Sequence, residues 1–458
     1  MINDPESLCR PRPYRVAITN AVCLNGGDAA IQMGTIAILR QKLVLLEPVV
    51  IFDDNSTAAG KYYPDLCVRQ APFHPPRRRG GVRFVSNILG RGLKLRRILA
   101  VRLWVAGWRL LGGALLIAGD RAAIEELRNI DVVISAGGTY ITDNYRWEFR
   151  FWFLQIAKAL GKPVILMTQS IGPVRGARRR KRLGKVLAAI DLVLVRDKPS
   201  AELLTSIGVA RDKVRTYFDA AFALVRQDQI LFAKEANRVE MQRLQVAVSI
   251  RQWERFSNDD PRTGSERYTK CFVHAVTCLV REYDAQITFV STCQGCPEYH
   301  LDDSKFAHRV FDRLSRDVQQ HVVVDSNFRG PHELIEEFSR FDVLIGMRMH
   351  ACILALCAGT PALPVAYEFK TRELFNRLGL AEFLCDIDTV EPDSFVYSIR
   401  TFLAKLPGFR DRLFRAIAHA RNDAIAAGDA IKCTIERVER STPSGQLGHY
   451  KRHPKLTR

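Results

Sequence analysis

Short apolar runs alternate with segments of helical periodicity along the chain, and this alternation constrains the fold more than any other feature. The runs at 14–19, 47–52 and 131–135 contain few polar residues. Between the first two, residues 31–43 place apolar side chains at helical spacing. Strands that are apolar on both faces are typical of a parallel sheet covered by helices on both sides. The sequence therefore predicts an α/β fold.

The pattern is interrupted once and then begins again. Residues 226–245 are polar with helical spacing, and new apolar runs follow from residue 246. A chain of 458 residues also exceeds the size at which one hydrophobic core remains efficient. We therefore predict two doubly wound, Rossmann-like parallel-sheet domains in tandem, with an overall architecture similar to two-domain glycosyltransferases. The predicted units are 1–235, 236–440 and a disordered basic tail over 441–458.

The positive charge of the chain is concentrated in one segment. The formal net charge is +19, and eleven Lys or Arg but no Asp or Glu lie between Leu66 and Gly119. Within 77–118, Leu, Ile and Trp interleave with the cations, so this stretch is predicted to be a basic amphipathic segment. It could lie on an anionic membrane surface, or it could be a long core helix with a solvated basic side.

The same charge raises the question of a nucleic-acid partner. No recognition module is visible, and the cations are mixed with Leu and Trp rather than spread over an aromatic stacking platform. We therefore expect no nucleic-acid partner.

The cysteine pattern indicates a reducing compartment. Eleven cysteines are scattered without the spacing of a disulfide framework, and no N-terminal apolar region precedes a cleavage site. The nearest candidate for a membrane-spanning helix, 98–118, contains Arg102 and Arg109, so it is not predicted to cross a membrane. We expect a cytoplasmic protein, peripheral at the inner face of the membrane if the basic segment binds lipid.

Polar residues and glycines follow directly after several predicted strands. In open parallel sheets, ligands bind beyond the carboxyl ends of the strands. Arginines, glycine turns and helix N-termini at these positions predict a site for a phosphate or a carboxylate. The candidate residues are Asn25, Asp28, Gly137, Gly138, Gln169, Arg196, Arg251, Arg348 and His350.

Several of these residues also have an ordinary structural explanation. Asp28 could be a helix N-cap, and Arg196 could belong to a surface ion pair. Arg251, directly after a buried strand, is harder to explain without a bound partner. His350 stands next to Arg348 at the carboxyl end of a strand, and this combination favours a functional role over a structural one.

A metal site is not predicted. Cys293, Cys296 and the nearby His300 suggest zinc, but a single Cys-x-x-Cys lacks its second pair of ligands. The sequence also contains no P-loop and no His-Glu-x-x-His.

These segments, in their order along the chain, resemble the polysaccharide pyruvyl transferase family over about residues 14–385. The matching pieces are Asn25-x-Gly27-Asp28, "SAGGTYITD", "QSIGP", "VRDKPSAELLTSIGV", "YFDAAFAL", the strand that ends at Arg251 and "DVLIGMRMHACILALCAGTPALPVAYEFK". The last is the most specific, with Arg-x-His-Ala followed by Gly-x-Pro and Tyr-x-x-Lys. Ala136 and Ser170 depart from glycines that are frequent in the family.

The resemblance implies transfer of a pyruvyl group from phosphoenolpyruvate to a sugar diol, which gives a cyclic ketal and inorganic phosphate. The acceptor would be a unit of a surface or exopolysaccharide, or its lipid-linked precursor. Phosphoenolpyruvate would be the donor substrate, with no cofactor and no metal.

The residues fit this chemistry in two groups. His350 is assigned as general acid/base, with Arg348 and Arg196 as clamps for the donor. The remaining substrate-binding candidates are Arg251 and Lys370 for the anionic donor, and Asn25, Asp28, Gly137, Gly138 and Gln169 on the N-terminal domain.

Two other functions remain open at this point. A glycosyltransferase of the same architecture would use a nucleotide sugar, and Glu368 or Glu373 could then bind its ribose. A catalytically inactive relative would only bind glycans.

Overall fold

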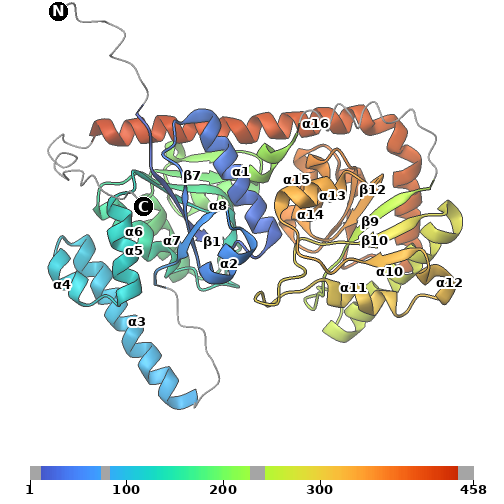
Figure 1. Cartoon of the computed structure of the whole chain (residues 1–458), viewed down its shortest axis with the longest axis horizontal. Helices are drawn as coiled ribbons and strands as arrows, with labels where there is room; N and C mark the ends of the chain where they lie inside the picture. The colour runs from blue at the N-terminus through green and yellow to red at the C-terminus, as the bar shows by residue number, and fades with distance from the viewer. Residues whose placement is uncertain (1–11, 74–82, 227–242, 442–458) are drawn as a thin grey trace, which may run out of the picture.

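The computed structural model describes residues 12–73, 83–226 and 243–441 (Figure 1). The first domain is built on an eight-stranded sheet in the order β3-β2-β1-β4-β6-β7-β8, with β5 beside β6. All of these pairings are parallel. Its strands are β1 (Val16–Ala21), β2 (Val50–Asp53), β3 (Cys67–Gln70), β4 (Val132–Ser135), β5 (Gly138–Ile141), β6 (Val164–Ile171), β7 (Leu192–Val195) and β8 (Val214–Thr216).

Helices cover both faces of this sheet. Alternate residues of β4 enter different cores, because Val133 packs on one face and Val132 with Ile134 on the other. The covering elements include α1 (Gly26–Lys42), α2 (Ser56–Tyr62), α6 (Arg150–Ala159), α7 (Ala177–Ala188), α8 (Lys198–Ser206) and the 3₁₀ helices η2 (Arg211–Lys213) and η3 (Ala220–Leu224).

The second domain repeats the plan with six strands. Their order is β11-β10-β9-β12-β13-β14, again with parallel pairing. The strands are β9 (Gln245–Ser249), β10 (Gln286–Phe289), β11 (Val322–Val324), β12 (Val343–Gly346), β13 (Ala362–Ala366) and β14 (Cys385–Asp386). The helices and 3₁₀ turn are α10 (Pro261–Tyr283), α11 (Ser304–Phe311), α12 (Arg316–Gln319), α13 (Pro331–Phe338), α14 (Met349–Cys357), α15 (Phe369–Arg377) and η5 (Ala381–Phe383). The prediction of two doubly wound parallel sheets is confirmed.

The C-terminal helix changes the predicted division of the chain. α16 (Pro392–Ser441) runs along both domains (Figure 1). Its first half contributes Phe395 and Phe402 to the core of the second domain, whereas Ile431 and Ile435 belong to a core of the first. The assignment of everything up to residue 440 to the second domain is therefore corrected, because the apolar stripe of this helix continues onto the first domain.

The predicted division at 235/236 lies outside the described residues, between 226 and 243. The predicted start of the tail at residue 441 coincides with the last residue of α16, and residues 442–458 lie outside the described ranges.

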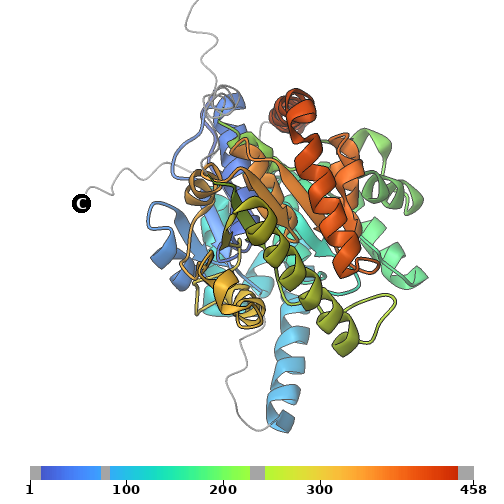
Figure 2. The same ribbon diagram turned by 90° about the vertical axis from the view of Figure 1, so that its right-hand side faces the viewer.

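The basic segment forms helices inserted between β3 and β4. They are α3 (Arg83–Val105), α4 (Arg109–Ala114) and the start of α5 (Ala118–Arg128), and residues 77–82 lie outside the described ranges. α3 projects away from the first domain in both views (Figure 1, Figure 2). In the part of the chain that the structure covers, no helix combines the length and apolarity needed to cross a bilayer.

Candidate functional site

A cavity of about 380 Å³ lies between the two domains, where strands of both sheets end. In each sheet the strand order reverses at the centre, between β1 and β4 and between β9 and β12. Loops diverge at such reversals, so ligand sites form there. The cavity is lined by all but one of the predicted residues, namely Asn25, Asp28, Gly137, Gly138, Arg196, Arg251, Arg348, His350 and Lys370.

Gln169 is the residue that the structure places elsewhere. It is fully buried, and its amide donates a hydrogen bond to the carbonyl oxygen of Ala136. The strand β6 continues to Ile171 instead of ending at Gln169, so the side chain lies inside the sheet. The prediction that Gln169 lines the site is corrected, since this residue supports the cavity wall from behind.

Arg196 and His350 meet at one buried carboxylate, that of Asp219. The Arg196 guanidinium forms an ion pair with Asp219, and His350 Nε2 lies 3.4 Å from Asp219 Oδ2. Arg196 also donates hydrogen bonds of 2.8 Å to Ser170 Oγ and Thr139 Oγ1. The predicted imidazole and guanidinium are thus held side by side although they come from different domains.

The charge of Asp219 is stabilised by these two neighbours. Burial alone would raise the pKa of Asp219, but the Arg196 guanidinium and the His350 imidazole outweigh it and hold the pKa well below its usual range. Asp219 also accepts a 2.9 Å hydrogen bond from the backbone N–H of Ala221, at the start of η3. Asp219 is not among the predicted site residues, although a single carboxylate inside the apolar run 218–224 is a signal that it has a buried partner.

His350 packs directly on the first turn of α1 in the other domain. A Cβ at position 27 would lie 2.7 Å from His350 Nδ1, and a Cβ at position 26 would lie 2.8 Å from the carbonyl oxygen of Thr292. The N–H of Gly26 donates a 2.8 Å hydrogen bond to that same oxygen. Gly26 and Gly27 are therefore required by the close approach of the two domains.

Arg348 is held by a bidentate ion pair. Its Nε and Nη2 donate to Asp303 at 2.8 and 2.7 Å, and both residues are buried. Burial disfavours the charge of Arg348, but the Asp303 carboxylate raises the pKa of this guanidinium above its usual value. The pair fixes Arg348 in the cavity wall and leaves Nη1 outside this contact.

A second group of cations follows β9 and β13, with Arg251 on the loop after β9 and Lys370 in the first turn of α15. Arg251 donates a 3.1 Å hydrogen bond to the hydroxyl of Tyr367, and its guanidinium lies 5.2 Å from the centre of that ring. Lys370 Nζ lies 2.8 Å from Glu368 Oε2. Although burial disfavours the charge, the Tyr367 hydroxyl and the Glu368 carboxylate raise the pKa of Lys370. The lysine therefore stays charged in the cavity.

Asn25 and Asp28 have different roles at the start of α1. Asn25 is the N-cap, because its Oδ1 accepts hydrogen bonds from the N–H groups of Gly27 and Asp28 at 3.0 and 3.4 Å. Asp28 lines the cavity, and within the described ranges its side chain forms no hydrogen bond or ion pair. Burial raises the pKa of Asp28 despite the nearby His350 and Lys370. Asp28 is thus a desolvated carboxylate that faces the cavity.

The first domain contributes further polar groups that the sequence analysis did not single out. Arg150 lies 4.9 Å from the centre of the Tyr140 ring, and its Nη1 is buried without a hydrogen-bond partner among the described residues. Asp53 accepts hydrogen bonds from the N–H groups of Cys23 and Asn55, both at 2.6 Å. Asp53 is the last residue of β2, so the same strand-end rule could have identified it. Arg150 opens α6, well beyond the end of β5, so that rule does not reach it.

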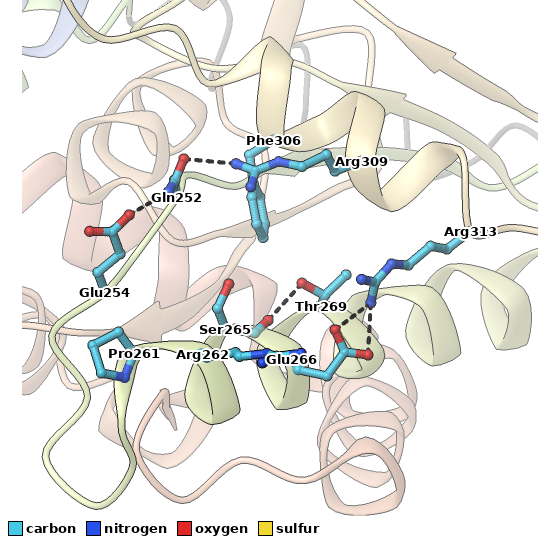
Figure 3. A pocket seen from close by; sticks show the side chains of 10 residues that line it. All are labelled: Gln252, Glu254, Pro261, Arg262, Ser265, Glu266, Thr269, Phe306, Arg309 and Arg313. Atoms are coloured by element: carbon cyan, nitrogen blue, oxygen red, sulfur yellow. Dashed lines mark hydrogen bonds and ion pairs between the residues drawn. The ribbon is translucent and has the colours of Figure 1, made fainter.

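A second groove, of about 340 Å³, lies on the second domain (Figure 3). Arg313 Nη1 lies 2.9 Å from both carboxylate oxygens of Glu266, and Arg309 donates a 2.8 Å hydrogen bond to Gln252 Oε1. These charged and polar groups are paired with one another, and none of the predicted site residues lines this groove. The cavity between the domains is therefore the candidate active site.

Cys293, Cys296 and His300, which suggested zinc, do not form a metal-binding cluster among the described residues. Cys293 and Cys296 are buried, and the ring of His300 packs 4.7 Å from that of Tyr299. Over residues 12–73, 83–226 and 243–441, no group of three or more His, Cys, Asp or Glu side chains is placed to hold a metal ion.

Solved structures share the fold of the whole chain. A putative UDP-N-acetylglucosamine 2-epimerase from Listeria monocytogenes matches with a TM-score of 0.55 and 13% identity, over 94% of this chain and 98% of that one. A glycosyltransferase from Rickettsia africae matches with a TM-score of 0.55 and 10% identity, over 94% and 100%. At these identities the likeness concerns the fold alone.

Sequence comparison identifies closer relatives. The amylovoran biosynthesis protein AmsJ from Erwinia amylovora is 27% identical over 304 residues, which cover 65% of this chain and 71% of that protein. The family model of polysaccharide pyruvyl transferase matches residues 25–368, most of the chain and nearly all of the cavity-lining segments. The chain belongs to the polysaccharide pyruvyl transferase family.

Proposed function

We propose that this protein transfers the pyruvyl group of phosphoenolpyruvate to two hydroxyls of a sugar unit, forming a cyclic ketal and releasing inorganic phosphate. The sugar belongs to an exopolysaccharide or to its lipid-linked precursor. The observation that carries the proposal is the gathering of Arg196, Arg251, Arg348, Lys370 and His350 around one cavity. Family membership and the similarity to an amylovoran biosynthesis protein support it.

The cations match a small molecule with two anionic groups. Phosphoenolpyruvate carries a phosphate and a carboxylate, and buried guanidinium groups with fixed geometry bind such oxygens well. Arg196 and Arg348 are oriented by Asp219 and Asp303. We assign them to the donor, together with the more exposed Arg251 and with Lys370.

The reaction begins when one sugar hydroxyl adds to C2 of phosphoenolpyruvate while C3 takes up a proton and becomes a methyl group. The C2–O bond to phosphate then breaks, and the second hydroxyl forms the second C–O bond of the ketal. Of the two hydroxyl protons released, one is balanced by the proton taken up at C3 and the other leaves with phosphate. The surrounding cations stabilise the negative charge of the departing phosphate.

His350 and Asp28 face the cavity from opposite domains and suit the two proton transfers. We assign His350 as the acid that protonates C3, with Asp219 as the residue that orients the imidazole. We assign Asp28 as the base that receives a proton from a sugar hydroxyl, because a desolvated carboxylate with no ion pair among the described residues is a stronger base than an exposed one. The polar wall around Asn25, Gly137 and Gly138 is assigned to the acceptor.

The alternative donor is a nucleotide sugar, which the shared fold would also accommodate. Glu368, the candidate for contact with a ribose, forms an ion pair with Lys370, and Glu373 does not line the cavity. These positions favour phosphoenolpyruvate. We place the reaction in the cytoplasm, with the acceptor presented at the inner face of the membrane.

The test is to incubate the protein and a candidate glycan with either phosphoenolpyruvate or UDP-sugars, while following release of phosphate and of UDP. We expect phosphate release together with a mass gain of the glycan, and loss of both in Arg196→Gln. Arg313→Gln, in the groove of Figure 3, is the matched control and should remain active. UDP release with no phosphate release would contradict the proposal.

A further inference from the structure

The outward side of α3 and α4 is apolar, whereas a solvated helix is normally polar on that side. On α3, Leu95 and Leu99 are 67% and 49% exposed. Just before and within α4, Trp108, Leu110 and Leu111 are 62%, 93% and 53% exposed. Isolated exposed apolar residues are common, but five large ones on two adjacent helices indicate an interaction surface.

The other side of α3 already has its packing partners. Arg97 forms a buried ion pair with Asp120, with Nε 2.7 Å from Oδ2, and Ala100 and Trp104 belong to a core of the first domain. α4 approaches α3 so closely that a Cβ on Gly112 would lie 2.6 Å from the Trp104 ring. These contacts fix the orientation of both helices. The outward residues therefore stay outside the hydrophobic core.

Helical spacing places a cation within the apolar face. Leu95, Leu99, Arg102 and Ala106 follow one another at intervals of three and four residues, so they share one side of α3. Lys94 and Arg96 flank this side, and both are exposed. Arg109 opens α4, and no Asp or Glu occurs between residues 92 and 119. The face thus combines apolar side chains with charged residues that are all positive.

Charge and shape together indicate what this face contacts. Lysine and arginine beside exposed leucine and tryptophan complement a bilayer with anionic headgroups, where the apolar side chains enter the interface and the cations meet the phosphates. α3 projects away from the body of the molecule in both views (Figure 1, Figure 2). Because α3 projects, the flat surface of a bilayer can contact it without meeting the rest of the molecule.

We propose that Leu95, Leu99, Arg102, Trp108, Leu110 and Leu111 form a docking face that binds the enzyme to an anionic membrane surface. Its purpose, to bring the cavity to a lipid-linked acceptor, rests on the proposed function. The binding itself does not, so the two can fail separately.

The test uses the full-length protein and vesicles of phosphatidylcholine, with or without phosphatidylglycerol, in a sedimentation assay. We expect binding to the anionic vesicles at low salt, weaker binding at high salt, and little binding to neutral vesicles. The double variant Trp108→Ser/Leu110→Ser should weaken the vesicle partition coefficient about a hundredfold, because each buried apolar side chain contributes about tenfold. Val323→Ser, 61% exposed on the second domain, is the matched control and should bind like wild type.

Circular dichroism and the melting temperature show whether the double variant is folded, and light scattering gives the molar mass. Absence of sedimentation with any vesicle at low salt would overturn the proposal. It would equally be overturned if the wild type were a dimer that the double variant converts to monomers, since a second copy would then cover the face. Vesicle binding without pyruvyl transfer would uphold the docking face and contradict only the proposed function.

Discussion

Asp219 contacts site residues of both domains. It lies between a guanidinium of the first domain and an imidazole of the second, and it is almost completely buried. A buried carboxylate of this kind holds both partners in place and balances the charge of the Arg196 guanidinium. We infer that Asp219 positions the catalytic groups without touching the substrate.

Asp219→Asn tests this positioning role. The amide keeps the size of the side chain but leaves the Arg196 guanidinium buried without its counterion, which is expected to lower the free energy of unfolding by about 3 kcal/mol. We expect kcat to fall about a hundredfold, with a smaller change in KM for phosphoenolpyruvate and an altered pH profile of kcat. Asp191→Asn, in a partly exposed ion pair with Lys158, should change none of these kinetic values. An unchanged pH profile in Asp219→Asn would argue against the role.

Asp28→Asn tests whether the ionised Asp28 carboxylate is needed for activity and lowers the stability of the fold. Burial raises the pKa of Asp28, so the folded state binds this proton more tightly than the unfolded state does. Ionisation of Asp28 therefore lowers the free energy of unfolding as the pH rises through the pKa of the folded state. Below the pKa of the unfolded state, this loss of stability is absent. We expect the variant to lose activity but to melt at a higher temperature than wild type at neutral pH, with the difference shrinking as the pH falls toward about 4. A variant that melts lower than wild type at neutral pH would contradict this account.

The site residues that could be predicted from the sequence share one property, which is their position just after a strand. Arg251 and Arg348 were found because the end of each apolar run marked the edge of the sheet. Gln169 was misplaced because β6 continues past it, and run length alone does not show where a strand stops. Asp219 and Asp303 were missed because their arginine partners lie 23 and 45 residues away, and a single sequence does not reveal such pairings.

At the level of secondary structure, the first turn of α1 determines how closely the domains approach each other. Gly26 forms a backbone hydrogen bond to Thr292, and Gly27 contacts the ring of His350. The N-terminus of α1 therefore contributes both to the cavity and to the domain interface.

Gly27→Ala is expected to disturb the site more than the fold. The added Cβ would lie 2.7 Å from His350 Nδ1, so the imidazole or the domain must move. Because displacement of a catalytic group by about 1 Å reduces rates up to about a hundredfold, we expect at least a tenfold loss of kcat. Gly119→Ala in α5 is the matched control, because nothing lies within 4 Å of its added Cβ and alanine favours a helix. Full activity of Gly27→Ala in a kinetic assay would contradict the proposed place of His350.

At the level of the whole molecule, α16 joins the two domains after both sheets are complete. The alternation of strands and helices predicted both sheets correctly, because inner strands such as β7 and β12 are apolar along their length. It did not predict the return of α16 to the first domain, since an amphipathic stripe does not specify which core it covers.

Ile431→Ala measures how much the first domain depends on this helix. Ile431 is fully buried in a core of the first domain, and truncation of a buried isoleucine lowers the free energy of unfolding by about 2–5 kcal/mol. We expect chemical denaturation to show this loss, whereas Val323→Ala at an exposed position should change stability by less than about 0.5 kcal/mol. A loss as small as that of Val323→Ala would show that α16 does not stabilise the first domain.

The most direct test of the central claim is a proton NMR spectrum of the glycan acceptor after incubation with the protein and phosphoenolpyruvate in D₂O. If His350 delivers an exchangeable proton to C3, the acceptor gains a ketal methyl group that carries one deuterium, and phosphate appears in equal amount. His350→Ala should abolish this signal. An acceptor that stays unchanged with phosphoenolpyruvate but is extended by a UDP-sugar would contradict the account.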